Sequence, residues 1–275
     1  MAKFVAQIAG VTANSSHMID FAALDWSAVL PFIAIGFGAQ LIDGALGMAF
    51  GVIATTALLL LGIPPALATS YVHVIKAFTG GASGVSHMIH GNVDWKLFAR
   101  LSAGGVVGGI AGALLLSHLH MNDANFARPF VFGYLILVGL FILWRGIGHK
   151  IARERRAKIV EPVALVGGFL DATGGGGWGP VVTSNLLLQG NNPRMTVGTV
   201  NTAEFVLAVA VSITYLLSLG IRDLTAPVIG LLIGGVAAAP LGSLLTRHIP
   251  ARQMMILVGA LLTAISIFGL YRVLA

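Results

Sequence analysis

The chain has 275 residues, of which 57% are hydrophobic and 9% are charged, and its formal net charge is +6. A soluble domain carries about 25% charged residues, so this sequence has too little charge to cover a surface exposed to water and predicts a protein embedded in lipid. It contains no cysteine, which excludes disulfides, thiol catalysis and cysteine-based zinc or iron–sulfur sites.

Residues 1–27 contain one short apolar run and are expected to form an extramembrane N-terminal lead. Ten apolar stretches follow. Six of them approach or reach the roughly 20 residues that a membrane-spanning helix needs: Ala66–Met88, Leu97–Leu119, Phe126–Trp144, Met195–Leu219, Leu224–Leu245 and Met254–Leu274. The four shorter stretches form two pairs with glycine-rich links: Ala28–Ile42 with Met48–Leu61, and Pro162–Leu170 with Val181–Leu188. Each pair is expected to be either a re-entrant hairpin or two short, kinked spans of an all-α polytopic membrane protein.

The order short, short, long, long, long occurs twice, which indicates an internal repeat. Displacing the chain by 128 residues superimposes, without a gap, Asp43 on Asp171, Gly47 on Gly175, Thr55 on Thr183, Pro65 on Pro193, His73 on Asn201 and Lys76 on Glu204. Chance similarity between apolar segments would match Leu and Val but would not match Asp, Gly and Pro in register. We therefore expect a first membrane repeat over 28–144, a basic linker over 145–160 and a second membrane repeat over 161–275.

The positions of the basic residues predict the orientation of the chain. Each half has an odd number of crossings whether its short pair spans or re-enters, so the two repeats are expected to be inverted. Six of the 16 Lys and Arg residues lie in 145–158, and the positive-inside rule therefore predicts that this segment is cytoplasmic. With that segment inside, 11 basic residues lie inside and four lie outside, and both termini are predicted to be outside.

Broken helices within inverted repeats are typical of secondary transporters, in which helix N-termini near the bilayer midplane face anionic groups. The sequence "DATGGGGWGP" interrupts the second short pair, and glycines there would bare backbone N–H groups to an anion. The alternative is that these glycines only allow close helix packing. The predicted substrate-binding residues are Gly44, Gly47, Thr55, His73, Lys76, Gly174, Gly175, Gly176, Gly177, Trp178, Thr183 and Asn201.

A polar stripe at helical spacing runs through the third apolar stretch and includes Lys76, a charged residue in the middle of a long span. Because Glu204 is its repeat equivalent, the sequence predicts a Lys76–Glu204 pair. That pair either binds an anion and carries a coupled proton, or simply joins the two repeats. His87 and His90 of the same stripe offer a rival hypothesis, a metal path.

Asp43 and Asp171 stand at the two breaks, where each is expected to cap the following helix. The alternative role for both aspartates, as for Glu204, is to carry a proton that is coupled to transport. The sequence contains no phosphate-binding loop and no arrangement of a nucleophile with a base, so neither a cofactor nor an enzymatic activity is expected. No metal site and no nucleic-acid partner are expected either.

The stretches "AQLIDGALGMAFGV" and "GGFLDATGGGGWGPVVTSNLL" resemble the TauE/SafE family of sulfite or organosulfonate exporters, as do "SGVSHMIHGNVDW" and "GTVNTAEF". The resemblance covers about residues 28–270. It implies a multi-pass protein of the bacterial inner membrane that transports sulfur-containing oxyanions such as sulfite, sulfoacetate or thiosulfate. The family often has Glu near the position of Lys76, so the departure at this position leaves Glu204 as the better candidate for an acidic coupling role.

These observations predict a secondary transporter of small sulfur-containing anions that exports its substrate by alternating access, with proton coupling as an option. The expected partners are the anionic substrate and membrane lipid, and a homodimer is left open. Two alternatives stand beside this reading: a divalent metal cation permease, and a membrane-embedded assembly subunit that transports nothing.

Overall fold

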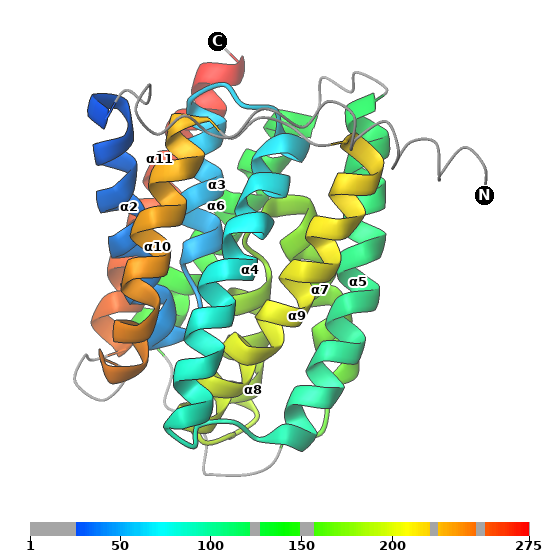
Figure 1. The fold of residues 1–275 in the computed structure, drawn as a ribbon, viewed down its shortest axis with the longest axis vertical. Coiled ribbons are helices and arrows are strands. Elements are labelled where there is room, and N and C mark those ends of the chain that lie inside the picture. The colour runs from blue at the N-terminus through cyan, green and yellow to red at the C-terminus, as the bar shows by residue number, and fades with distance from the viewer. Residues whose placement is uncertain (1–25, 122–126, 149–156, 221–224, 246–250, 275) are drawn as a thin grey trace.

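A computed structural model describes residues 26–121, 127–148, 157–220, 225–245 and 251–274, and these residues form helices and connecting turns without a strand (Figure 1). The predicted lead, apart from its last two residues, and residues 149–156 of the basic linker lie outside the described residues. The elements are α2 (Trp26–Leu46), α3 (Phe50–Leu60), α4 (Pro65–Ile89), α5 (Trp95–Met121), α6 (Ala127–Gly148), α7 (Glu161–Gly174), the π-helix η1 (Gly179–Thr183), α8 (Ser184–Leu188), α9 (Pro193–Leu219), α10 (Ala226–Leu245) and α11 (Ala251–Leu274).

Local sequence explains why equivalent helices of the two halves begin and end at matching positions. Pro65 and Pro193 open α4 and α9 in the first turn, where a missing N–H costs nothing. Gly62 and Gly190 precede them with φ angles of 86° and 94°, a left-handed conformation that glycine adopts without strain. Helices α2 and α7 also end 128 residues apart, as do α3 and α8. The sequence repeat is therefore also a repeat of local structure.

The two halves are interlocked rather than placed side by side. Helix α2 packs along α10 of the second half, and its equivalent α7 packs along α5 of the first half. The equivalent helices α4 and α9 pack against each other, as do α6 and α11. Figure 1 shows α4 descending and α9 ascending, so equivalent helices run in opposite directions. The equivalent helices α4 and α9 therefore pack on each other in opposite directions at the junction of the two halves.

Each short helix turns back toward the end of the bundle from which its pair entered. In Figure 1, α2 descends from the top and the chain returns upward through α3. Helix α7 rises from the bottom, and η1 and α8 return there. The turns between them, residues 47–49 and 175–178, are buried. In lipid, irregular backbone is tolerated where protein surrounds it, and these turns meet that condition.

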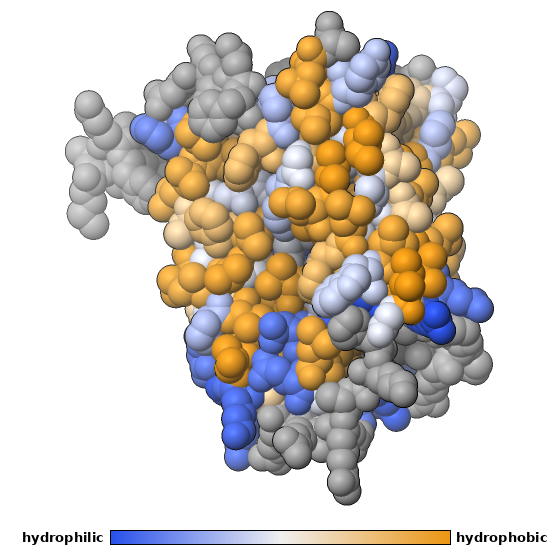
Figure 2. Space-filling view, turned by 180° about the vertical axis from the view of Figure 1, so that it is seen from behind, coloured by the Kyte–Doolittle hydropathy of each residue, from blue (hydrophilic) through white to orange (hydrophobic). Residues whose placement is uncertain are grey.

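The outer surface of the bundle has the polarity that a bilayer requires. Figure 2 shows a broad apolar belt above a polar rim at the lower end. Five described helices are long and apolar enough to cross a membrane, namely those that contain 26–45, 95–120, 129–148, 193–219 and 256–274. Helix α2 is therefore longer than the sequence predicted, because it continues through Gly44 to Leu46. The starts of α5, α9 and α11 and the end of α6, which carry basic residues, all lie at the lower end (Figure 1).

The start of α2 and the end of α11 lie together at the upper end of the bundle (Figure 1). The first and the last described helix therefore begin and end, respectively, at the same end of the bundle. Several basic residues used for the orientation argument, among them Lys3, Arg222 and Arg247, lie outside the described residues.

The two turns meet at the centre, and glycine makes their contact possible. A Cβ on Gly51 would overlap with the carbonyl oxygen of Gly175, and a Cβ on the equivalent Gly179 would overlap with the carbonyl oxygen of Gly47. Each short helix therefore packs its first turn directly on the backbone of the opposite break. This contact joins the two halves of the bundle at its core.

We expect Gly51→Ala and Gly179→Ala to destabilise the protein by similar amounts, because each inserts a methyl group against backbone that has little room to move. Overpacking of this kind costs about 1–3 kcal/mol. Thermal unfolding in detergent would measure the change, with Gly38→Ala in α2 as the control, since a Cβ on Gly38 meets no atom within 4 Å. Melting temperatures equal to that of the control would contradict the central contact.

Candidate functional site at the helix breaks

The two breaks are built in the same way around an aspartate. Asp43 Oδ1 accepts a hydrogen bond of 3.1 Å from the backbone N of Phe50, and Asp171 Oδ1 accepts one of 3.1 Å from the backbone N of Trp178. Each carboxylate thus satisfies an N–H group at the start of the following short helix, as the sequence predicted. The backbone turns at Gly47 and Gly175, which have φ angles of 67° and 71°.

The glycines of the second break lie against other parts of the protein in this conformation. A Cβ on Gly174 would overlap with the ring of Tyr134, and one on Gly176 would overlap with Val52. A Cβ on Gly177 would lie 2.5 Å from the backbone N of Asp171. Close packing alone therefore explains why glycine is needed at these positions. The predicted approach of an anion to them stays a prediction, and larger residues there would disturb packing and binding together.

The other predicted residues of the breaks hold the two halves together. Thr183 Oγ1 donates a hydrogen bond of 2.9 Å to the carbonyl oxygen of Gly47 in the opposite break. Its equivalent Thr55 is fully buried beside Gly175, and its hydroxyl has no hydrogen-bond partner. Trp178 is also fully buried, and its Nε1 donates to the carbonyl oxygen of Val200 at 3.2 Å. The indole thereby anchors the second break to α9.

A cluster of charged side chains, which we call the central cluster, lies beside the breaks and comprises His73, Lys76, Asp171 and Glu204. Lys76 Nζ lies 2.7 Å from Asp171 Oδ2 and 2.6 Å from Glu204 Oε1. The pair of Lys76 with Glu204 is the one that the repeat predicted. Its bond to Asp171 was not predicted, because no sequence signal placed a residue of α7 next to α4. The four residues are 0–6% exposed, so the cluster is closed to both ends of the bundle.

A second polar chain leads from the lower end of the bundle toward this cluster. Arg194 Nε donates to Asn92 Oδ1, and Asn92 Nδ2 lies 3.3 Å from His87 Nδ1. His87 Nε2 in turn lies 3.3 Å from Asn201 Nδ2, and the ring also bonds to the backbone of Gly44. His87 is thus held between amides and backbone, and it connects a basic helix start to the repeat equivalent of His73.

Arg145 is a buried cation that the sequence analysis treated only as a topology signal. It is 7% exposed, and its Nη1 donates to the carbonyl oxygen of Ser184 at 2.5 Å. Its Nε and the Ser184 hydroxyl are buried without hydrogen-bond partners. The hydroxyl of Thr55 beside Gly175 and the amide oxygen of Asn201 beside Gly47 are in the same situation. Buried polar atoms of this kind mark places where water or a ligand is needed.

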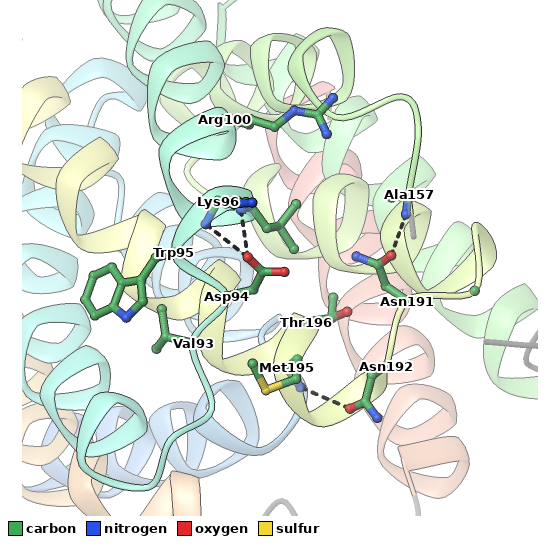
Figure 3. A pocket seen from close by; sticks show the side chains of 12 residues that line it. Val93, Asp94, Trp95, Lys96, Arg100, Ala157, Asn191, Asn192, Met195 and Thr196 are labelled. Atoms are coloured by element: carbon green, nitrogen blue, oxygen red, sulfur yellow. Dashed lines mark hydrogen bonds between the residues drawn. The ribbon is translucent and has the colours of Figure 1, made fainter. Parts of the chain in front are cut away.

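The lower end of the bundle contains a pocket of about 800 Å³ between the start of α5 and the start of α9 (Figure 3). Asp94 lies inside it and accepts hydrogen bonds from the backbone N atoms of Lys96 and Leu97, at 3.0 and 3.1 Å. Lys96 and Arg100 also line the pocket. None of the residues of the central cluster lines it. The pocket is therefore separate from the cluster in this conformation.

The rival hypothesis of a metal path gains no support from the side chains. Among the described residues, no group of three His, Asp or Glu side chains has an arrangement that could hold a metal ion. His90 Nδ1 lies 2.7 Å from the carbonyl oxygen of Ser86, and His87 faces the amides of Asn92 and Asn201. The stripe that contains these histidines instead directs Lys76 and His73 toward carboxylates.

Comparison with known proteins places this arrangement among membrane transporters. The sequence matches the family described as Sulfite exporter TauE/SafE over residues 4–269. It is similar to the Probable membrane transporter protein YtnM of Bacillus subtilis (strain 168), with 41% identity over 246 residues that cover 86% of this chain and 81% of the relative. No solved structure matches the sequence. The family match extends over both halves and includes every residue of the central cluster.

We expect Lys76→Met to lower the melting temperature strongly, because it leaves two buried carboxylates without their counter-ion. Breaking a buried ion pair by removing one partner costs about 3–5 kcal/mol. Adding Glu204→Gln to Lys76→Met should recover part of this loss, since it removes one unpaired charge. Thermal unfolding in detergent would measure both effects.

The matched control is Arg100→Met, which breaks the exposed Arg100–Glu161 pair. It should leave the melting temperature close to that of the wild type, because water solvates both partners. Equal losses for Lys76→Met and Arg100→Met would contradict the described burial of the central cluster.

Proposed function

Because this chain belongs to the TauE/SafE family and is a multi-pass membrane transporter, we propose that it carries small sulfur-containing anions, such as sulfite, thiosulfate or sulfoacetate. The family description and the residues at the two breaks support this substrate class. We further propose that transport proceeds by alternating access and in the direction of export.

The observation that carries the proposal is a buried lysine at the meeting point of the two broken helix pairs. Lys76 is 3% exposed, and its ammonium lies next to the carboxylate of Asp171, which caps the second short helix. Ionisable residues at membrane depth are costly and are typical of substrate pathways. An ammonium beside a helix start is a combination that attracts an anion. The substrate would replace one of the carboxylates at Lys76.

Alternating access accounts for a site that is closed to both ends. The two hairpins enter the bundle from opposite ends and touch through the backbone at Gly51 and Gly179. A small displacement of one hairpin against the other would open the cluster to one side at a time. The pocket at the lower end, which Lys96 and Arg100 line, is a suitable vestibule for an anion on that side.

The basic residues support an orientation in which the lower end faces the cytoplasm of a bacterial cell, with both chain ends outside the inner membrane. The starts of α5, α9 and α11 at this end carry Lys96, Arg194 and Arg252. An excess of Lys and Arg on short cytoplasmic segments is the general rule for membrane proteins.

We expect purified protein in liposomes to exchange external labelled thiosulfate for thiosulfate trapped inside, because a transporter moves its solute without other subunits. The exchange should saturate and should be inhibited by sulfite and sulfoacetate. Lys76→Met/Glu204→Gln should lose the exchange, since it lacks the cation even though it regains stability, whereas Gly38→Ala, whose added Cβ meets no atom within 4 Å, should keep it. Absence of exchange by the wild type would favour an assembly subunit, and exchange of nickel or cobalt instead would favour a metal permease.

The orientation can be tested directly, because the chain contains no cysteine. In intact cells, Leu274→Cys at the exposed end of α11 should react with an impermeant maleimide. Lys158→Cys at the lower end should react only after the membrane is permeabilised. The reverse pattern would show that the lower end faces outward.

A further inference from the structure

The two hydrogen bonds of the His73 ring indicate that the central cluster binds a proton. The role in transport that we infer for bound protons rests on the proposed transport of anions. The Nδ1 of His73 lies 2.8 Å from the carbonyl oxygen of Thr69, and its Nε2 lies 3.1 Å from Asp171 Oδ2. A carbonyl oxygen accepts and cannot donate, so Nδ1 must carry a hydrogen. A neutral imidazole would then present a bare Nε2 lone pair to a carboxylate oxygen.

A proton between Nε2 and Oδ2 removes this conflict. It resides either on Nε2, which makes His73 an imidazolium, or on Asp171, which then donates to Nε2. In both cases the pair holds one proton more than a neutral histidine and an ionised aspartate. At 3.1 Å the two atoms are in direct contact, so no water molecule lies between them to resolve the conflict in another way.

The charges of the surrounding groups point in the same direction. Lys76 supplies one positive charge, whereas Asp43, Asp171 and Glu204 supply three negative ones. Asp43 is close enough to Glu204 for the two carboxylates to repel each other, and both are attracted to Lys76. Among the described residues, Tyr134 of α6 and Tyr215 of α9 also interact electrostatically with Asp171, and they add no positive charge. Tyr215 donates its hydroxyl hydrogen to the carbonyl oxygen of Ala172 at 2.7 Å.

The repeat explains why this excess of negative charge lies on one side of the cluster. The attractive pair of Lys76 with Asp171 has a repeat equivalent, which is Glu204 with Asp43. The exchange of lysine for glutamate turns that equivalent into two carboxylates in a buried site. Two carboxylates in one buried site repel each other, and a proton on either of them relieves the repulsion. An anion that approaches Lys76 would add another negative charge to them.

We propose that the central cluster is a proton-binding site that takes up a proton together with the anion, so that the two are transported in the same direction. One proton resides between His73 and Asp171. When an anion binds at Lys76, a proton from solution binds to the Glu204 carboxylate, which releases the ammonium and removes the charge that would repel the anion. The net charge of the site is then unchanged by a monovalent anion.

The test is the pH dependence of thiosulfate binding to the purified full-length protein, measured by calorimetry from about pH 6 to about pH 8. Thiosulfate keeps its charge over this range, so any dependence belongs to the protein. Uptake of one proton per anion predicts a dissociation constant that rises about tenfold per pH unit where the free cluster is deprotonated. A dissociation constant that is independent of pH, or that falls as pH rises, would overturn the proposal.

Variants locate the proton that is taken up. Glu204→Gln, which has the shape and charge of the protonated residue, should bind thiosulfate with no pH dependence. Glu161→Gln at the exposed end of α7 should keep the wild-type dependence. The same pH dependence in Glu204→Gln and the wild type would overturn the assignment to Glu204. If Glu204→Gln does not fold, the slope of the wild type still decides whether a proton is taken up.

The failure of this proposal differs from the failure of the proposed function. Exchange of thiosulfate in liposomes needs no proton gradient, so normal exchange with pH-independent binding would overturn only the proton site. The absence of both binding and exchange at every pH would overturn the anion transport itself. For the resident proton, NMR should show either a doubly protonated histidine, missing in His73→Gln, or a protonated Asp171 carboxyl group. A neutral His73 signal together with a carboxylate signal for Asp171 would overturn that part.

Discussion

The burial of the Lys76 ammonium between Asp171 and Glu204 is the constraint around which the bundle is organised. The three residues come from α4, α7 and α9, so a single cation links both repeats and one of the broken helix pairs. A charge at this depth is stable only with its partners in place, and each partner is equally dependent on the cation. The helices that carry them cannot move independently without exposing or separating charges. A ligand that competes for Lys76 therefore acts on the packing of both halves at once.

The two breaks are connected to the central cluster through Asp171 and to each other through glycines. Asp171 accepts a hydrogen bond from the Trp178 backbone with one carboxylate oxygen and binds Lys76 and His73 with the other. The conformation of the break is thus connected to the charge state of the cluster through one side chain. Because Gly51 and Gly179 bring the two breaks into backbone contact, a displacement of one break also displaces the other. This coupling is what an alternating-access cycle requires of a central site.

The two repeats have the same fold but different chemistry at their equivalent positions. Replacement of Lys76 by Glu204 and of His73 by Asn201 gives one half a cationic side and the other a carboxylate side. The polar chain through His87 approaches Asn201, whereas His73 faces Asp171. An inverted repeat with this asymmetry can present two different groups to a substrate while both halves keep the same helix geometry.

The sequence by itself determined the all-helical membrane fold, the matching bounds of equivalent helices and the capping role of Asp43 and Asp171, because these depend on composition, spacing and local backbone chemistry. It also predicted the pair of Lys76 with Glu204, since an approximate two-fold relation brings equivalent residues together. Only the tertiary structure decided that α2 and α7 pack on helices of the opposite half, that Asp171 joins the cluster and that Arg145 is buried beneath Ser184. The contacts of Asp171 with Lys76 and of Arg145 with Ser184 join residues that are 95 and 39 positions apart. No local signal encodes which of several similar apolar faces will meet.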